Sequence, residues 1–161
     1  MGEIVTRAAT TYDMVEGKPK FAITLLSVEE FHIFWPGISG MLDTVPHTWK
    51  HWTKDWIVSE VEAGRIQVWG LGPPPKAVLI FFTHVIIYPA YKVLSISWGA
   101  GSFDPEMLFV GESALMHYAR LHGCSEIEMR GRPGYDPHLK AIGAKLEAYV
   151  WSLPVPNVRV N

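Results

Sequence analysis

Residues 95–106 read SISWGAGSFDPE and place two glycines, Gly99 and Gly101, between a strand-like run and a helix-start pattern. Glycines let the backbone approach phosphate oxygens closely, and the positive end of a helix favours anions. A plain turn between a strand and a helix would use the same residues. Asp104 adds a negative charge where an anion would bind, and Pro105 lacks an amide hydrogen. These two residues favour the turn.

His84 interrupts an apolar stretch, Phe82–Val85, in a predicted strand. A neutral imidazole can accept a proton from an amine near neutral pH, which makes His84 a candidate general base. A histidine that is simply hydrogen-bonded within the sheet is the alternative, and it involves no chemistry.

No metal site is predicted. His47, His51 and Asp55 follow the i, i+4, i+8 spacing of one helix face. A zinc site needs four protein ligands, or three with a water, and no cysteine or third histidine lies nearby. Because Lys50 and Lys54 are interleaved, a solvated polar face is the better interpretation.

The composition bounds the class of protein. The chain has 161 residues, 48% of them hydrophobic, which suits one well-packed domain. A net charge of −2 without a basic block argues against a nucleic-acid binder. The single cysteine, Cys124, excludes an internal disulfide and favours a reducing compartment, and no apolar run reaches the ~18 residues of a membrane span. Seven tryptophans and seven phenylalanines suggest an aromatic assembly surface.

Hydrophobic periodicity, caps and breakers predict the order β-α-α-β-β-β-α-β-α-β. Ser27 and Glu30 form a capping-box pattern, and Pro36 is expected to interrupt the helix that they begin. Asp104 and Pro105 are expected as the N-cap and first residue of a later helix. The expected strands cover residues 21–26, 65–69, 77–82, 92–98, 126–129 and 145–153, and the clearest helices cover 47–63, 105–122 and 137–142. Residues 1–20 are expected as an N-terminal arm, 21–153 as the domain and 154–161 as a C-terminal tail.

This order, together with three short stretches, resembles the GCN5-related N-acetyltransferase (GNAT) fold over about residues 21–153. The stretches are Leu139–Ala144 (LKAIGA), which looks like the closing motif of the family, Glu62–Trp69 and Gly131–Gly134. The chain looks most like the small acetyltransferase-like proteins of tailed bacteriophages, some of which are virion components. The resemblance implies an α/β (α+β) domain with a mixed, mainly antiparallel central sheet of about six strands and helices on both faces.

In that family a Gln/Arg-x-x-Gly-x-Gly/Ala loop binds the pyrophosphate of acetyl-CoA through backbone amides. The resemblance places this loop at Ser97, Trp98, Gly99, Ala100 and Gly101, with Ile96 in place of Gln or Arg. The family also commonly uses a tyrosine of the penultimate helix to protonate the leaving thiolate. Leu139 occupies that position here, so Tyr135 is the remaining candidate acid, alongside His84 as candidate base.

These departures predict an acetyltransferase-fold protein with a degenerate cofactor site and no cofactor. It would act as a structural or protein-binding component of a tailed-phage virion, in the virion or the host cytoplasm, with other virion subunits or copies of itself as partners. Binding of nucleic acid and insertion in a membrane are not expected. The alternative is an acetyl-CoA-dependent N-acetyltransferase acting on an amine. A third reading is a phage-encoded inhibitor of a host protein.

Overall fold

The computed structural model describes residues 12–15, 18–45, 52–73, 76–130 and 133–147. The chain divides into two units, Met1–Gly131 and Arg132–Asn161. In the described part of the second unit, a 3-10 turn, Pro133–Tyr135, leads into α4 (Asp136–Ala141). None of the described helices is long and apolar enough to cross a membrane.

The first unit is built on a six-stranded sheet with the order β1-β2-β3-β4-β5-β6. Neighbouring strands pair antiparallel, except β5 and β6, which are parallel. This confirms the expected mixed, mainly antiparallel sheet. The strands are β1 (Tyr12–Val15), β2 (Lys18–Leu25), β3 (Gln67–Gly72), β4 (Leu79–Ile87), β5 (Lys92–Gly101) and β6 (Glu126–Met129).

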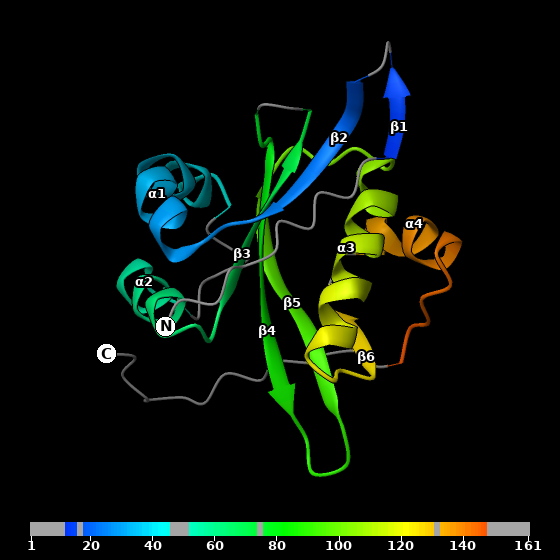
Figure 1. Cartoon of the computed structure of the whole chain (residues 1–161). Helices are drawn as coiled ribbons and strands as arrows, with labels where there is room; N and C mark the ends of the chain where they lie inside the picture. Colours follow the sequence, from blue (N-terminus) through cyan, green and yellow to red (C-terminus); the bar gives the residue numbers. More distant parts are fainter. Residues whose placement is uncertain (1–11, 16–17, 46–51, 74–75, 131–132, 148–161) are drawn as a thin grey trace, which may run out of the picture. The chain divides into compact units, whose positions relative to one another are not determined.

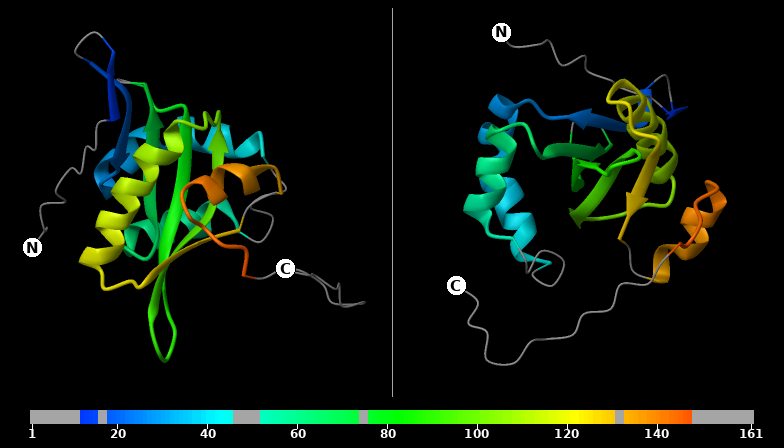
Figure 2. Two further views of the ribbon diagram at one scale, coloured as in Figure 1. Left: turned by 90° about the vertical axis from the view of Figure 1, so that its right-hand side faces the viewer. Right: turned by 90° about the horizontal axis from the view of Figure 1, so that it is seen from below.

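Helices cover both faces of this sheet, as expected. The first two helices, α1 (Val28–Asp43) and α2 (Lys54–Glu62), lie on one face, and α3 (Met107–Leu121) lies on the other (Figures 1 and 2). Each helix layer buries its own core. The core under α1 and α2 includes Phe31, Ile57, Val68, Phe82 and Ala100. The core under α3 includes Ile23, Trp69, Leu94, Val110 and Ala114.

The first helix confirms one prediction and corrects another. The hydroxyl of Ser27 accepts a hydrogen bond from the Glu30 amide, and the Glu30 carboxylate accepts one from the Ser27 amide. Pro36, however, does not interrupt the helix, which continues to Asp43. Phe31 before the proline and Ile38 after it are both buried against the sheet. This burial holds both halves of α1 in place and outweighs the hydrogen bond that proline removes.

Two other helices begin later than expected. The second helix begins at Lys54, where the Thr53 hydroxyl accepts a hydrogen bond from the Trp56 amide; the part of the prediction before Trp52 lies outside the described residues. The third begins at Met107 with Glu106 as its N-cap residue. Asp104 caps a preceding turn instead, since its carboxylate accepts a hydrogen bond from the Glu106 amide.

The sixth strand of the sheet comes from the N-terminal side of the chain. This additional strand is β1, which lies within the segment expected as an N-terminal arm and pairs with β2. At the other end, residues 145–147 have no regular structure, and the rest of the expected last strand lies outside the described residues.

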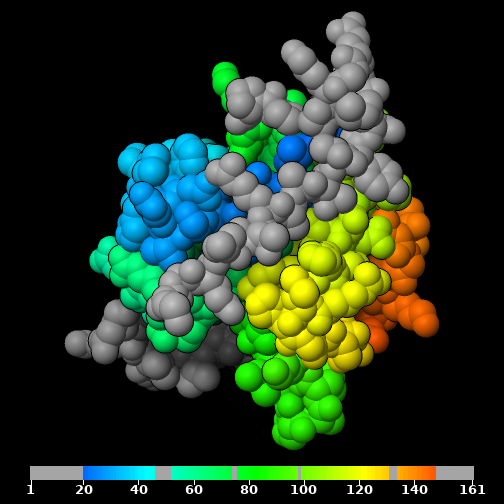
Figure 3. Space-filling model, in the orientation of Figure 1, coloured from blue at the N-terminus to red at the C-terminus, as the bar shows by residue number. Residues whose placement is uncertain are grey.

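The β4–β5 hairpin positions the candidate site. Its strands pair from Leu79 with Gly101 to Ile87 with Lys92, and its tip extends beyond the helices (Figure 3). The parallel pairing of β5 with β6 ends at Ile96 and Met129. One bulge interrupts the hairpin ladder: Phe82 faces Trp98 and Thr83 faces Ile96, so Ser97 is the extra residue.

Candidate functional site

The glycine segment is part of a strand, although the resemblance implied a loop. Ser97, Trp98, Gly99, Ala100 and Gly101 all belong to β5, whose ladder with β4 continues to Gly101. Beyond Ile96, the described part of β6 does not continue along this segment. The segment therefore lies between β4 and an edge that β6 leaves open.

Close packing against β4 explains both glycines. A Cβ atom on Gly101 would lie 2.1 Å from the Val78 carbonyl oxygen, and its φ of +118° is strained for other residues. A Cβ atom on Gly99 would lie 3.0 Å from the Ile80 carbonyl oxygen. The missing side chains thus make room for the neighbouring strand, without any ligand.

The turn after Gly101 uses several of its own amides. Ser102 N–H donates to the Val78 carbonyl at 2.8 Å, and Met107 N–H donates to the Asp104 carbonyl at 2.9 Å. The Glu106 amide is bonded to the Asp104 side chain, and Pro105 has no amide hydrogen. The amides of Ser102, Glu106 and Met107 are therefore already bonded and not available to the diphosphate of acetyl-CoA.

His84 and Ser97 form a polar pair where β5 leaves β6. The bulge aims the Ser97 side chain toward β4, where its Oγ lies 2.6 Å from His84 Nδ1. The other ring nitrogen, Nε2, is not engaged in this bond. Which group donates the proton in this bond depends on the tautomer of the imidazole.

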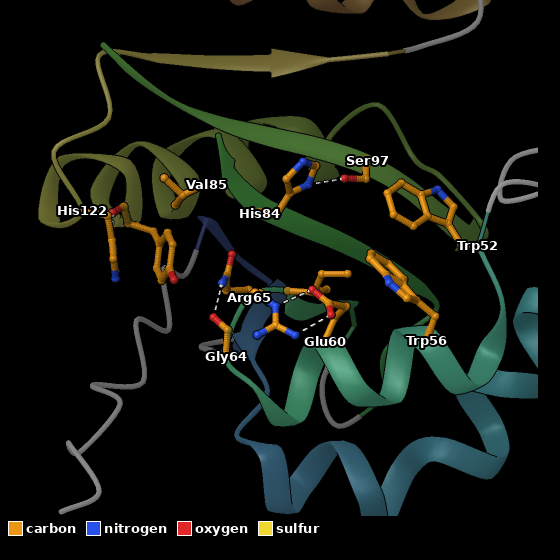
Figure 4. Close-up of a pocket in the computed structure, with 12 residues that line it drawn as sticks. Trp52, Trp56, Glu60, Gly64, Arg65, His84, Val85, Ser97 and His122 are labelled. Atoms are coloured by element: carbon orange, nitrogen blue, oxygen red, sulfur yellow. Dashed lines mark hydrogen bonds and ion pairs between the residues drawn. The ribbon is translucent and has the colours of Figure 1, made fainter. Parts of the chain in front are cut away.

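This pair lines a pocket of about 490 Å³ (Figure 4). That volume lies within the range of about 300–1,000 Å³ that is usual for small-molecule sites. All of the lining residues belong to the first unit. They are Trp52, Trp56, Glu60, Gly64, Arg65, Ile66, Gln67, His84, Val85, Ser97, Tyr118 and His122.

Burial keeps His84 neutral. Desolvation is the main influence and lowers the pKa of the imidazole below its usual value of 6.5. The Glu128 carboxylate acts in the opposite direction and raises this pKa, whereas the Arg130 guanidinium lowers it. Since the net direction is downward, His84 is uncharged at neutral pH and available as a proton acceptor.

The one carboxylate among the pocket-lining residues is already paired. Arg65 donates from Nε to Glu60 Oε2 at 2.7 Å and from Nη2 to Glu60 Oε1 at 2.6 Å. This bidentate hydrogen bond lowers the pKa of the Glu60 carboxyl and raises that of Arg65. The pair is therefore ionised and mutually neutralised at any pH near 7.

Aromatic rings form two parts of the wall. Trp52 and Trp56 pack with ring centroids 4.2 Å apart and an interplanar angle of 35°. Tyr118 stacks on His122 with a centroid separation of 3.9 Å. Burial raises the pKa of the Tyr118 phenol, so its hydroxyl stays protonated.

Sequence reasoning and structure agree only in part on these residues. His84 and Ser97 were singled out separately, but no pattern linked them, because the bulge that joins them does not show in the spacing. Trp52 and Trp56 fall within the expected helix 47–63, and no role in a site was predicted for them. Tyr135 lies at the start of α4, in the second unit. Its role as an acid stays a prediction.

For metal binding, His47 and His51 lie outside the described residues and Asp55 lies in the first turn of α2. Across the described ranges, no cluster of three or more histidine, cysteine, aspartate or glutamate side chains could hold a metal ion.

Several solved structures that are similar to this chain are named as acetyltransferases. An aminoglycoside acetyltransferase from an uncultured soil metagenomic sample is similar, with a TM-score of 0.64 and 10% identity over 84% of this chain and 98% of its own. A GCN5-related N-acetyltransferase from Ralstonia eutropha JMP134 has a TM-score of 0.60 and 13% identity over 84% and 98%. Glucosamine-6-phosphate N-acetyltransferase from Arabidopsis thaliana has a TM-score of 0.59 and 15% identity over 83% and 97%.

Sequence comparison adds no further relative, since neither a protein-family model nor a curated protein matches the chain. The structural likeness shows that the chain has the GNAT fold.

Proposed function

We propose that this protein is an acyltransferase that moves the acetyl group of acetyl-CoA to an amine held in the pocket beside His84. The observation that carries the proposal is a neutral, pocket-lining imidazole, hydrogen-bonded to Ser97 at the bulge where β5 leaves β6. The names of the similar structures support the same reaction class.

His84 acts as the general base. When its Nδ1–H donates to Ser97 Oγ, Nε2 carries the lone pair and accepts the amine proton as nitrogen attacks the acetyl carbonyl. In this tautomer Ser97 Oγ accepts the hydrogen bond and fixes the ring orientation. It is a positioning residue, and its test is a change in the pH profile.

Acetyl-CoA supplies an activated acetyl thioester. The open edge of β5 along Ser97–Gly101 would hold its arm, and a backbone amide near Trp98 would polarise the carbonyl. In the overall transfer the C–N bond forms, the C–S bond breaks and the leaving thiolate gains a proton. Tyr118, a protonated phenol that lines the pocket, would donate that proton.

The test combines two measurements on the whole chain. Calorimetric titration with acetyl-CoA should give micromolar binding or tighter, and release of the coenzyme A thiol should depend on an added panel of amines. Ser102→Glu, which places a negative charge on an exposed side chain of the turn, should weaken acetyl-CoA binding. If millimolar acetyl-CoA produces no heat of binding and no thermal shift, the proposal is ruled out.

A protein-binding component without a cofactor is the second candidate. It is favoured by the occupied amides of the turn after Gly101 and by exposed apolar side chains such as Phe34 and Ile87. A place in a phage virion remains a prediction of the resemblance alone. If the gene lies in a phage genome, mass analysis of purified particles tests it, and absence of the protein from the particles would remove this role.

A further inference from the structure

We infer that the acceptor of this reaction is an uncharged aromatic amine rather than a polycation. This inference rests on the proposed function and adds the chemical class of the acceptor. It is carried by two features of the pocket, the tryptophan pair and the neutralised carboxylate.

The tryptophan pair offers a flat apolar wall. Trp52 precedes α2 and Trp56 lies in its first turn, so they are four residues apart and their indoles pack in a tilted arrangement. Both rings are partly exposed and line the same pocket as His84 and Ser97 (Figure 4). An aromatic ring placed against an indole gains offset-stacking or edge-to-face contacts in addition to the burial of its area.

The charges of the pocket select against cations. Glu60 is the only acid among its lining residues, and Arg65 occupies both of its oxygens. The Glu60 side chain is only 15% exposed, so a second cation has little access to it. Each ammonium group of a polyamine would lose water in this pocket and find no unpaired carboxylate among the lining residues.

The base imposes the same preference. A neutral imidazole that resists protonation is poorly suited to deprotonating a strongly basic alkylammonium, whereas an aromatic amine is already uncharged at neutral pH. An uncharged amino group beside the His84 ring, with its own aromatic ring against Trp56, satisfies both features.

The test measures binding to the full chain without acetyl-CoA, using 4-methoxyaniline, phenethylamine and spermidine as probes. Calorimetry should show that 4-methoxyaniline binds best and spermidine least. Trp56→Leu should weaken 4-methoxyaniline binding about two- to ten-fold, the range that aromatic contacts give. Phe34→Ala removes an exposed aromatic ring of α1 outside the pocket and should leave binding unchanged. Thermal melting of each variant checks that it is folded.

Arg65→Gln provides a second, opposite test. It releases the Glu60 carboxylate, so phenethylamine and spermidine should bind measurably better to this variant than to the natural chain. Tighter binding of either cation than of 4-methoxyaniline to the natural chain would overturn the inference. So would 4-methoxyaniline binding that is insensitive to Trp56→Leu.

The two proposals fail in different ways. If 4-methoxyaniline binds as expected but acetyl-CoA does not, the pocket assignment stands and the transferase function fails. If acetyl transfer occurs but only to spermidine, the function stands and the acceptor class is wrong.

Discussion

The glycine segment and the His84–Ser97 pair both lie on the β4–β5 hairpin. Both depart from regular sheet geometry, but the first allows close packing and the second redirects a side chain. At Gly99 and Gly101 the backbone of β5 comes so close to β4 that a Cβ atom would meet a carbonyl oxygen. A few residues earlier, the bulge at Ser97 aims a hydroxyl at an imidazole that lines a pocket. The close approach of the two strands at Gly99 and Gly101 serves packing, whereas the redirected Ser97 side chain gives His84 a hydrogen-bond partner.

This difference shows how glycines are to be interpreted. A phosphate and a neighbouring strand both require a backbone without a side chain, so Gly-x-Gly alone cannot distinguish them. The neighbouring groups distinguish the two cases. A Cβ atom on Gly101 would meet the Val78 carbonyl oxygen, whereas the His84 side chain lines a pocket.

The largest effect is expected at Gly101. Gly101→Val should lower the free energy of unfolding by at least about 3 kcal/mol, because it combines a strained φ with a clash against β4. Urea denaturation measures it. As a control, Gly37→Ala should raise stability by about 0.5–1 kcal/mol, since Gly37 lies within α1 and has open space around it. A loss below about 1 kcal/mol for Gly101→Val would contradict the packing role.

The next effect concerns catalysis. His84→Asn keeps a side-chain amide that can bond to Ser97 but removes the titratable nitrogen, so kcat/KM for acetyl transfer should fall about 100-fold or more. Thermal melting should change little, because the residue is only partly buried. Ser97→Ala is the matched variant: it should shift the pH profile and reduce kcat less. A fall of less than about three-fold for His84→Asn would contradict the role as a base.

How much of this could be predicted from the sequence depended on the range of the interaction. The Ser27 cap, the strands of the β4–β5 hairpin and the end of α3 rest on neighbouring residues and were predicted. Five of the six strands followed from hydrophobic patterning and the resemblance, whereas β1 lies in the segment expected as an arm. Continuation of α1 through Pro36 was missed, because burial on both sides of the proline is a tertiary effect.

The candidate site was less predictable for the same reason. The His84–Ser97 contact depends on a one-residue bulge in the pairing of two strands. The pocket brings α2, the hairpin and the end of α3 together, and no short spacing in the sequence records that juxtaposition.

A smaller effect is expected at the turn after the glycine segment. Asp104→Asn removes one negative charge but keeps an oxygen to accept the Glu106 amide. If the diphosphate of acetyl-CoA binds at this turn, affinity should rise about two- to five-fold, the usual size of a charge effect at a helix N-terminus. Calorimetry at low and high salt measures it. Unchanged affinity would place the diphosphate elsewhere and leave the segment with packing alone.

The smallest effect is on stability against pH. An unfolded histidine binds a proton near pH 6.5, whereas burial lowers the pKa of folded His84. Between these two pKa values the unfolded state binds more protons, so stability falls as the pH drops below 6.5. Denaturation of the natural chain and of His84→Asn across this window should show a shallower fall in the variant. Identical slopes would mean that His84 has an ordinary pKa.

The central claim is that His84 is a neutral base that lines the pocket and carries its proton on Nδ1, next to Ser97. Nitrogen NMR of ¹⁵N-labelled imidazoles tests it without any ligand, with His84→Asn assigning the resonance among the seven histidines. The account predicts a pKa below 6.5 and, at pH 7, a proton on Nδ1 with Nε2 unprotonated. A pKa at or above 6.5, or a proton on Nε2 at pH 7, would contradict it.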